Sequence, residues 1–462
     1  MRLSPSSKAA ALIIAATLWA SLALAQSSTN LTALQGLAPV SVLDNTAAGK
    51  AALAANLTIT AAIQDGSTKQ PLLQPFSEQQ QLALRDANIT AGNAYDLADG
   101  LGTSLDGVYW SLATVQSTYG GKTPSFTNVA TTIARLIAFT NATTRSDSTS
   151  AKYFFGNGTR DGKTPVSAAA TAVMNGAKGQ PDIFGRAYGH PAGSVNADAF
   201  GNSRPFQTEP RLARFSGRNF FGVQSGNLAY LEGPGQDLRN NPSFPSGHAT
   251  YGYAESLILA MLVPERYLEM ITRAAEYGND RIILGAHYTM DVLGGRTLAI
   301  YDIAQLLANK PDYAGVKRRD LVLDDYRNAF ADARSDMAAA LEQGCGGTLA
   351  TCARRDESRF ADAAKNKEFY EATQTYRLPV VFAHTADHTE DVQQLAPEAG
   401  YLLTTAFPYL TLAQANAILT DTEGPGGGFL DDGSAFGVYS RLDLYRAAEK
   451  AVSLAPVAGR HA

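Results

Sequence analysis

Apolar residues recur three or four positions apart along several stretches of the chain, which is the spacing of one face of an α-helix. The helices that this spacing predicts cover residues 77–101, 127–143, 250–263, 265–278 and 290–309. Ser77 is a candidate N-cap for the first of them, since its hydroxyl oxygen can accept from a backbone N–H. Pro264 predicts the end of one helix and the beginning of the next.

Segments rich in glycine and polar residues separate the predicted helices. The pattern predicts an exposed loop over 154–165 and a glycine-rich turn over 423–434, followed by a last short helix over 441–452. Between these, residues 312–370 have a helical and strongly charged pattern. No stretch of strand length alternates apolar and polar residues, so we predict an all-α fold, a helical bundle.

The first 25 residues have the pattern of a secretory signal peptide. Arg2 and Lys8 precede an apolar run over 9–24, and small residues near Ala25 fit a cleavage site. An uncleaved membrane anchor is the alternative, but the apolar run is short and rich in alanine. After this segment no apolar run approaches the roughly 20 residues of a membrane span. We therefore expect cleavage near Ala25, a periplasmic or secreted protein, and no membrane span in the mature chain.

Composition limits the partners of the protein. Of the 462 residues 45% are hydrophobic and 18% are charged, which is typical of a globular chain with a large core. The net charge of −5 provides no basic surface for nucleic acid or anionic lipid. An anionic substrate would therefore need a local cluster of arginines.

The two cysteines, Cys345 and Cys352, flank a short glycine-rich stretch. In an oxidising compartment we expect a local disulfide between them. A metal site would need further ligands, and no histidine lies close to them in the sequence.

Three short stretches carry candidate chemistry. The first is the dipeptide Arg204-Pro205, the second is P-S-G-H over 245–248, and the third is R-x5-H-x3-D from Arg281 to Asp291. Each alone is also typical of ordinary structure, such as a solvated turn or a helix N-cap. Together they provide what a phosphoryl group needs: arginine forks, exposed backbone N–H groups and two imidazoles.

The residue types suggest how these stretches divide the work. Ser246 and Gly247 stand at the start of a helix, where backbone N–H groups favour an anion. One histidine can attack phosphorus while another protonates the leaving oxygen. Asp291 follows His287 by four residues, one helical turn, and can hold the ring in the attacking tautomer.

These stretches resemble the motifs of the type 2 phosphatidic acid phosphatase superfamily, which includes class A bacterial acid phosphatases and vanadium-dependent haloperoxidases. The family pattern is K-x6-R-P, then P-S-G-H, then S-R-x5-H-x3-D, and the close resemblance covers about 198–300. It implies a phosphatase-like helical bundle over 26–310 and leaves 311–462 as a helical extension packed on it.

The resemblance also implies roles for seven residues. His287 would be the nucleophile, Asp291 would orient it, and His248 would be the general acid. The phosphoryl oxygens would be held by the side chains or amides of Arg204, Ser246, Gly247 and Arg281. The arginines would supply the positive charge, so no metal and no cofactor is expected.

Two positions depart from the family pattern. The family lysine falls on Ala197, and the serine before the third-motif arginine is Asp280. Losing one charged donor costs about 2–4 kcal/mol in transition-state stabilisation unless another group replaces it. Candidates nearby in sequence are Arg211, Arg214 and Arg218. Asp280 can either pair with Arg281 or face solvent.

The predicted function is an exported, metal-independent acid phosphatase that forms a phosphohistidine and acts on a small phosphorylated substrate. A haloperoxidase that holds vanadate as cofactor is an alternative, whereas vanadate would inhibit a phosphatase. A lipid phosphatase and a non-catalytic phosphate-binding protein are two further alternatives. The sequence does not indicate an oligomeric state.

Two other histidine-bearing stretches are weaker candidates. His384 and His388 stand four residues apart among acidic residues and could bind a metal if helical, although a solvated loop is the simpler interpretation. His190 precedes the first stretch and could approach the site.

Overall fold

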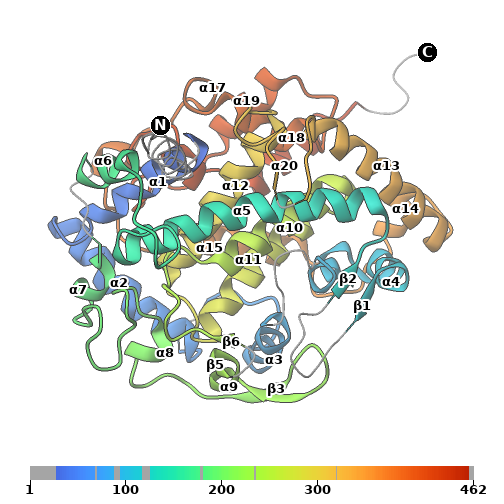
Figure 1. Ribbon diagram of the computed structural model, residues 1–462. Coiled ribbons are helices and arrows are strands. Elements are labelled where there is room, and N and C mark those ends of the chain that lie inside the picture. Colours follow the sequence, from blue (N-terminus) through green and yellow to red (C-terminus); the bar gives the residue numbers. More distant parts are fainter. Residues whose placement is uncertain are drawn as a thin grey trace, which may run out of the picture.

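The computed structural model describes residues 28–67, 70–87, 94–116, 125–176, 181–233, 236–318 and 320–456. The predicted signal peptide, 1–25, and its cleavage site near Ala25 lie outside these ranges. The predicted all-α class is confirmed, because helices dominate the described chain (Figure 1). The strands there form three antiparallel two-stranded ribbons: β1 (Thr114–Gln116) with β2 (Ser125–Thr127), β3 (Ser216–Arg218) with β4 (Gln224–Gly226), and β5 (Glu232–Gly233) with β6 (Gln236–Asp237).

Three helices form the centre of the molecule: α10 (Gly247–Leu262), α11 (Tyr267–Ile283) and α12 (Thr289–Leu307). Almost every residue of α10 and α12 is buried, including Glu255, Arg296 and Asp302, because neighbouring elements cover both helices. The predicted helices in this region are confirmed, with boundaries moved by a few residues. Pro264 begins a 3-10 turn, η3 (Pro264–Arg266), between α10 and α11.

The long helix α5 (Thr131–Asn157) crosses in front of the central helices and packs against α10 and α12 (Figure 1). It is longer than the predicted helix over 127–143, and the loop predicted to begin at residue 154 begins at Gly158. Phe154 and Phe155 are buried, and their packing extends the helix. Gly158 then ends it with a left-handed backbone (φ 70°).

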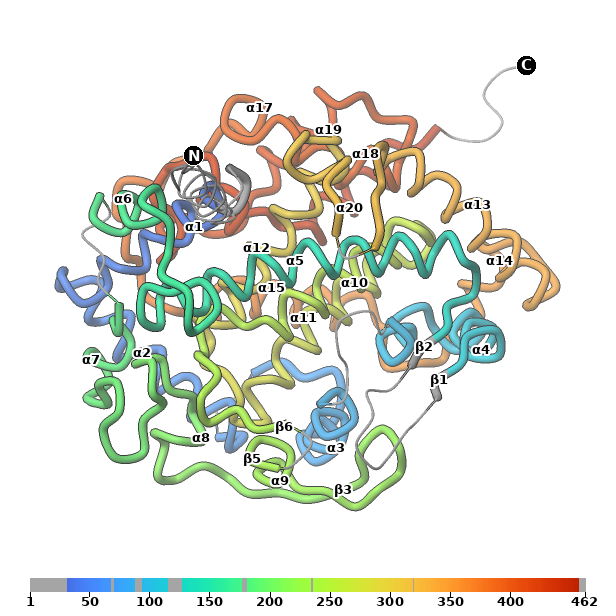
Figure 2. Tube along the Cα trace, viewed as in Figure 1, coloured from blue at the N-terminus to red at the C-terminus, as the bar shows by residue number. Residues whose placement is uncertain are grey.

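The N-terminal part surrounds the lower and left sides of this centre in the view of Figure 2. The prediction of Ser77 as N-cap is wrong: α3 begins one residue earlier, at Phe76, with Pro75 at the cap position. The elements of this part and of the following segment are α1 (Ser28–Leu37), η1 (Ala38–Val42), α2 (Ala47–Gln64), α3 (Phe76–Asp86), η2 (Asp96–Leu101), α4 (Thr103–Leu112), α6 (Ala168–Gly176), α7 (Ile183–Ala187), α8 (Pro205–Thr208) and α9 (Asn227–Leu231).

The segment after α12 packs on the upper side of the same centre (Figure 2). Buried Arg296 of α12 donates to the carbonyl oxygens of Gln374 and Leu442 over 3.3 and 3.1 Å, which ties this segment to α12. The predicted helical pattern over 312–370 is wrong for its first part, since the described residues of 311–325 form turns and a bridge. The elements are α13 (Tyr326–Cys345), α14 (Leu349–Ala353), α15 (Ala363–Thr375), α16 (Ala383–Ala386), α17 (Val392–Leu395), η4 (Pro397–Gly400), α18 (Tyr401–Thr404), α19 (Leu412–Asp421), η5 (Gly437–Ser440) and α20 (Leu444–Ser453).

The predicted disulfide is present. Cys345, the last residue of α13, is bonded to Cys352 of α14 and closes a small loop. Among the described residues, no helix combines the length and the apolar character needed to cross a membrane.

Candidate active site

Segments far apart in sequence meet where α8, α10 and α12 begin. The N–H of Ser246 donates to the carbonyl oxygen of Asp291 over 2.9 Å, which joins the start of α10 to the first turn of α12. Nη1 of Arg204 donates to the carbonyl oxygen of Ala286 over 2.9 Å, which joins the start of α8 to the loop before α12. The structure therefore brings together the three stretches singled out in the sequence.

His287 lies in the loop between α11 and α12 and is completely buried. Its Nε2 is 2.9 Å from Nη1 of Arg204, and its Nδ1 is 3.3 Å from both Oδ2 of Asp291 and Oγ of Ser243. A guanidinium only donates, so Nε2 must accept and the ring proton lies on Nδ1. Burial, and then the neighbouring cations with Arg204 first, hold the pKa of His287 well below 6.5. The ring is therefore neutral, with the lone pair on Nε2.

Asp291 holds this tautomer from the first turn of α12. Its Oδ2 accepts from the backbone N–H of Tyr288 over 2.8 Å and from the hydroxyl of Ser243 over 2.5 Å. Burial raises the pKa of Asp291 to about 6, although the hydrogen bonds from Ser243 and Tyr288 oppose the rise. Ser243 was not among the predicted residues, and no motif marks it, because it bonds to Asp291 only in the folded chain.

Each nitrogen of the Arg204 guanidinium donates at least one hydrogen bond to a neighbouring group. Its Nε donates to the carbonyl oxygen of Asn241 over 2.8 Å, and its Nη2 to the side-chain oxygen of Asn241 over 2.9 Å and to the carbonyl oxygen of Pro242 over 3.3 Å. Burial, together with the like charge of Arg281, lowers the pKa of Arg204 to about 10, so the guanidinium remains charged at neutral pH.

Arg281, in the last turn of α11, is buried, and no carboxylate of the described residues forms an ion pair with it. Its Nε, Nη1 and Nη2 have no hydrogen-bond partner among the described residues. The guanidinium lies over the ring of Tyr230, 5.6 Å from the ring centre. An unpaired buried cation is costly, and an anion bound beside it would remove that cost.

His248 lies in the first turn of α10 and is half-buried. Burial lowers the pKa of its ring well below 6.5, and the positive charges of Arg281, Arg204, Lys152 and Arg145 lower it further. A bound anion would raise that pKa again, which a general acid requires.

Ser246 and Gly247 form the start of α10. The Ser246 hydroxyl accepts from the N–H of Ala249 over 3.1 Å and therefore caps the helix. A Cβ atom at Gly247 would have only ordinary contacts, at 3.5 Å from the Tyr251 hydroxyl and 3.6 Å from Cε of Lys152. The hydroxyl O–H of Ser246 and the backbone N–H groups at the helix start can both donate to an anion, so the phosphate contact at these residues remains a prediction.

Lys152 of α5 is a further cation at the site that the sequence did not single out. It is buried, and its Nζ donates to the carbonyl oxygens of Pro242 and, over 3.3 Å, Ser243. Arg211, Arg214 and Arg218 are all exposed, and no described hydrogen bond or ion pair joins them to the site. They do not replace the family lysine.

Asp280 neither pairs with Arg281 nor faces solvent, so both expectations for it are wrong. It is buried, and its Oδ1 accepts from Gln79 over 2.6 Å. Burial, and then the charges of Asp86 and Glu276, raise its pKa well above 3.8. The helical geometry of α11 turns this side chain toward α3.

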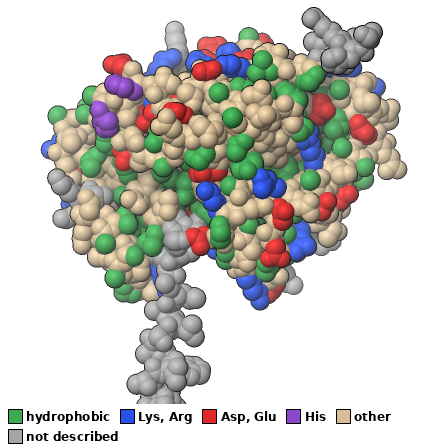
Figure 3. Space-filling view, turned by 90° about the horizontal axis from the view of Figure 1, so that it is seen from above, with side chains coloured by type: hydrophobic (Ala, Val, Ile, Leu, Met, Phe, Trp, Pro, Cys, Tyr) green, Lys and Arg blue, Asp and Glu red, His purple; other side chains and the backbone are tan. Residues whose placement is uncertain are grey.

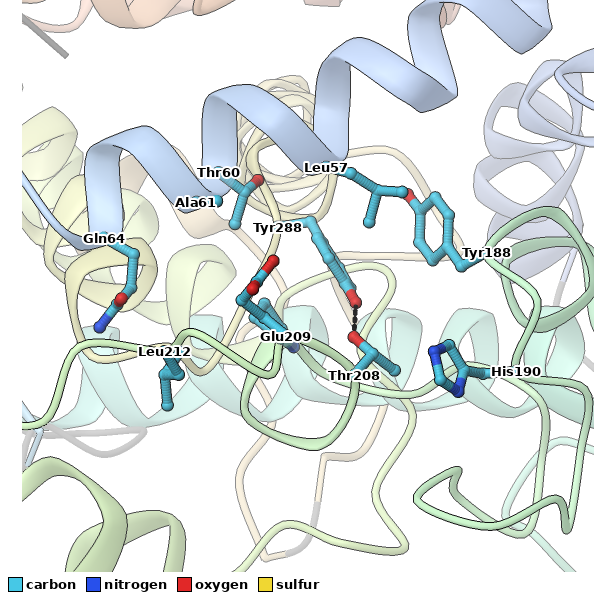
Figure 4. Close-up of a pocket in the computed structure, with 11 residues that line it drawn as sticks. Leu57, Thr60, Ala61, Gln64, Tyr188, His190, Thr208, Glu209, Leu212 and Tyr288 are labelled. Carbon is cyan, nitrogen blue, oxygen red and sulfur yellow. Dashed lines mark hydrogen bonds between the residues drawn. The ribbon is translucent and has the colours of Figure 1, made fainter. Parts of the chain in front are cut away.

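The two weaker candidates lie elsewhere. His388 follows the end of the short helix α16, so it is not one helical turn from His384, and the described residues contain no group of three or more metal-binding side chains. His190 lines a cavity of about 120 Å³ together with Tyr188, Thr208 and Tyr288 (Figure 4). The hydroxyls of Thr208 and Tyr288 are 2.5 Å apart there. None of the seven predicted site residues lines this cavity.

Parts of the chain are similar in sequence to known proteins. Residues 192–309 match the PAP2 superfamily, which confirms the resemblance over this segment. A non-specific acid phosphatase of Salmonella typhimurium is 44% identical over 69 residues, which are 15% of this chain and 28% of the relative. An acid phosphatase of Zymomonas mobilis is 39% identical over 71 residues, 15% of this chain and 27% of the relative. A non-specific acid phosphatase of Providencia stuartii is 29% identical over 144 residues, 29% of this chain and 56% of the relative. The chain therefore spans between 27% and 56% of the length of these relatives.

Proposed function

From the PAP2 superfamily domain at residues 192–309, we propose that the chain is an exported, metal-independent acid phosphatase that hydrolyses small phosphomonoesters through a phosphohistidine on His287. The observation that carries the proposal is the buried guanidinium of Arg281 without a hydrogen-bond partner in the described chain, whose charge acts on Arg204 and on the neutral His287. Such a cluster of donors and nucleophile suits a tetrahedral oxyanion.

The first half of the reaction transfers the phosphoryl group to the enzyme. The Nε2 lone pair of His287 forms a bond to phosphorus, the bond from phosphorus to the ester oxygen breaks, and His248 gives its proton to the leaving oxygen. An alcohol departs. Attack requires that Nη1 of Arg204, which donates to Nε2, turn its N–H to a phosphoryl oxygen.

The second half returns the enzyme to its starting state. A water molecule attacks phosphorus while His248 takes one of its protons, and the bond between phosphorus and Nε2 breaks. Inorganic phosphate leaves, and one water has been consumed for each ester. In both halves Asp291 stabilises the positive charge that the His287 ring acquires.

Hydrolysis of an aryl phosphate by the mature chain tests these roles. We expect His287→Ala to lower kcat/KM by about 10⁴-fold or more, and His248→Ala by about 10²–10⁴-fold. His190→Ala is the matched control, since His190 lines the separate cavity of Figure 4, and it should keep the wild-type rate. A His287→Ala variant with the rate of the wild type would contradict the proposal.

The pH dependence of kcat/KM is predicted from two groups, because His248 must be protonated whereas Asp291 must be ionised. His248 must carry a proton in the first half, so kcat/KM falls as the pH rises through its lowered pKa. Asp291 must be ionised, so kcat/KM also falls as the pH drops below its pKa of about 6. We expect a bell-shaped profile on the acidic side, whereas a flat profile would contradict the assignment.

Orthovanadate distinguishes the phosphatase from the haloperoxidase alternative. It should inhibit phosphate ester hydrolysis by occupying the phosphoryl site. Halide oxidation by hydrogen peroxide in its presence would instead favour the haloperoxidase.

Export is supported by the sequence pattern of residues 1–25 and by the disulfide, since disulfides persist in oxidising compartments. Protein recovered from outside the cytoplasm should begin near Gln26 when its N-terminal sequence is determined. A chain that begins at Met1 would contradict cleavage.

A further inference from the structure

Helix α5 lies against the start of α10 and presents a polar strip to it. Ser148 and Lys152, four residues apart on one face of α5, both lie close to Gly247, with Oγ of Ser148 at 3.8 Å and Cε of Lys152 at 3.6 Å from a Cβ built there. Gly247 is the third residue of the P-S-G-H motif. A helix that belongs to none of the three motifs therefore contributes to the same site.

Lys152 and Arg204 converge on one carbonyl oxygen. Nζ of Lys152 and Nη2 of Arg204 both donate to the carbonyl oxygen of Pro242. Nζ also donates to the carbonyl oxygen of Ser243, the residue whose hydroxyl is bonded to Asp291. The ammonium group is thus placed next to an arginine that contacts His287.

The environment of Lys152 is unusual for a buried lysine. No salt bridge joins it to a carboxylate in the described chain, and two carbonyl oxygens use two of its three N–H donors. Burial, and then the charge of Arg204, hold the pKa of Lys152 well below 10.5. An anion beside it would favour the charged ammonium and accept the remaining N–H.

We propose that Lys152 binds a phosphoryl oxygen and stabilises the transition state, in the place of the motif lysine that is absent at Ala197. This inference rests on the proposed phosphatase function for the nature of the ligand. The cation comes from a helix that precedes the first motif by about 50 residues, and only the packing of α5 on α10 brings it there.

The test uses Lys152→Met and Lys152→Gln in the full mature chain. Methionine keeps the length and apolar stem of the side chain without its charge, whereas the glutamine amide can still donate to Pro242. Lys50→Met, at an exposed position on helix α2, is the matched control. Thermal unfolding shows whether each variant is folded.

Binding of inorganic phosphate, measured by calorimetry, is the first readout because it does not depend on turnover. We expect both Lys152 variants to bind phosphate about 10- to 100-fold more weakly than the wild type. We expect kcat/KM for an aryl phosphate to fall about 10²–10³-fold, and orthovanadate inhibition to weaken with it. Lys50→Met should change none of these.

The outcomes separate the two proposals. A wild type that binds phosphate but has no turnover contradicts the phosphatase function, and the binding data still test Lys152. Wild-type affinity and rate in a folded Lys152→Gln variant would overturn the role of Lys152 and leave the phosphatase function standing. A wild type that binds no phosphate overturns both.

Discussion

Ser243 supports two of the groups on which the proposed chemistry depends. Its hydroxyl donates to Oδ2 of Asp291 over 2.5 Å and lies 3.3 Å from Nδ1 of His287. The hydrogen bond lowers the pKa of Asp291, so Ser243→Ala should raise that pKa above about 6. The acid limb of kcat/KM should then move toward neutral pH by about one pH unit, measured as a pH–rate profile.

The control for this variant is Ser111→Ala, since within the described chain the exposed hydroxyl of Ser111 donates to the carbonyl oxygen of Val108 in its own helix and to nothing else. Its profile should match the wild type. If Ser243→Ala lowers the rate equally at every pH, Ser243 acts through packing alone and does not set the ionisation of Asp291.

Residue identity in the motifs was enough to predict which side chains meet, but not what surrounds them. The spacing of Arg281, His287 and Asp291 could be recognised because they lie at one junction of two helices. Lys152 and Ser243 could not be recognised, since their contacts with the site depend on how α5 and the 241–246 loop pack in three dimensions.

Gly295 lets helix α12 approach the start of α10. A Cβ at this position would lie 2.5 Å from the carbonyl oxygen of Ser246 and 3.1 Å from Cβ of Ala249. Gly295→Ala must therefore push the start of α10, with His248, away from His287. We expect kcat/KM to fall about 10²-fold and the free energy of unfolding to fall by about 1–3 kcal/mol, measured by steady-state kinetics and urea denaturation.

Gly107→Ala is the matched glycine control. Gly107 lies on the exposed side of α4, and a Cβ there would meet nothing within 4 Å. This change should leave kcat/KM unaltered and increase the free energy of unfolding by up to about 1 kcal/mol, because alanine favours helix over glycine. Wild-type kinetics in Gly295→Ala would mean that the approach of α12 to α10 is not needed for the geometry of the site.

Helices were predictable where their pattern was strong, and their ends were not. The central helices α10 and α12 were found from their long apolar stretches, and α11 from apolar residues at helical spacing. The end of α5 was placed too early because 154–165 is polar beyond its two phenylalanines, while the burial of Phe154 and Phe155 is decided by tertiary packing. The charged pattern after residue 312 likewise did not reveal that 311–325 is not helical.

Charge is arranged differently at the surface and in the interior of the whole molecule. On the face shown in Figure 3 acidic and basic side chains are interspersed. In the interior, cations gather at the candidate site, and several carboxyl groups with raised pKa values are buried elsewhere, some of them beside arginines. Burial is the largest cause for each of them, and the pKa rises to about 7 for Asp96, about 8 for Asp106 and about 7 for Glu390 and Glu423. Neither the net charge of −5 nor the local sequence indicates which carboxyl groups are buried.

These buried carboxyls predict that the fold is more stable in mild acid than in mild alkali. Each has a folded pKa above its unfolded value, so the folded chain holds more protons and the stabilisation is lost as the pH rises through the folded pKa. Between about pH 5 and its folded pKa of about 7 or 8, each such group lowers the free energy of unfolding by up to about 1.4 kcal/mol per pH unit. Lys152, His248 and His287, whose pKa values are lowered, act in the opposite direction.

Urea denaturation of the mature chain at a series of pH values measures this slope. We expect the free energy of unfolding to fall from about pH 5 to about pH 7.5, and Asp96→Asn to make the slope shallower because it removes one titrating carboxyl. Asp99, whose pKa is lowered to about 2 by Arg273 and Arg359 against the cost of burial, stays ionised throughout this range and adds no slope. Stability that rises with pH over the range would show that the buried carboxyls are ionised in the folded chain. An acid-favouring slope would instead match the acidic pH range in which a phosphatase with a protonated His248 works.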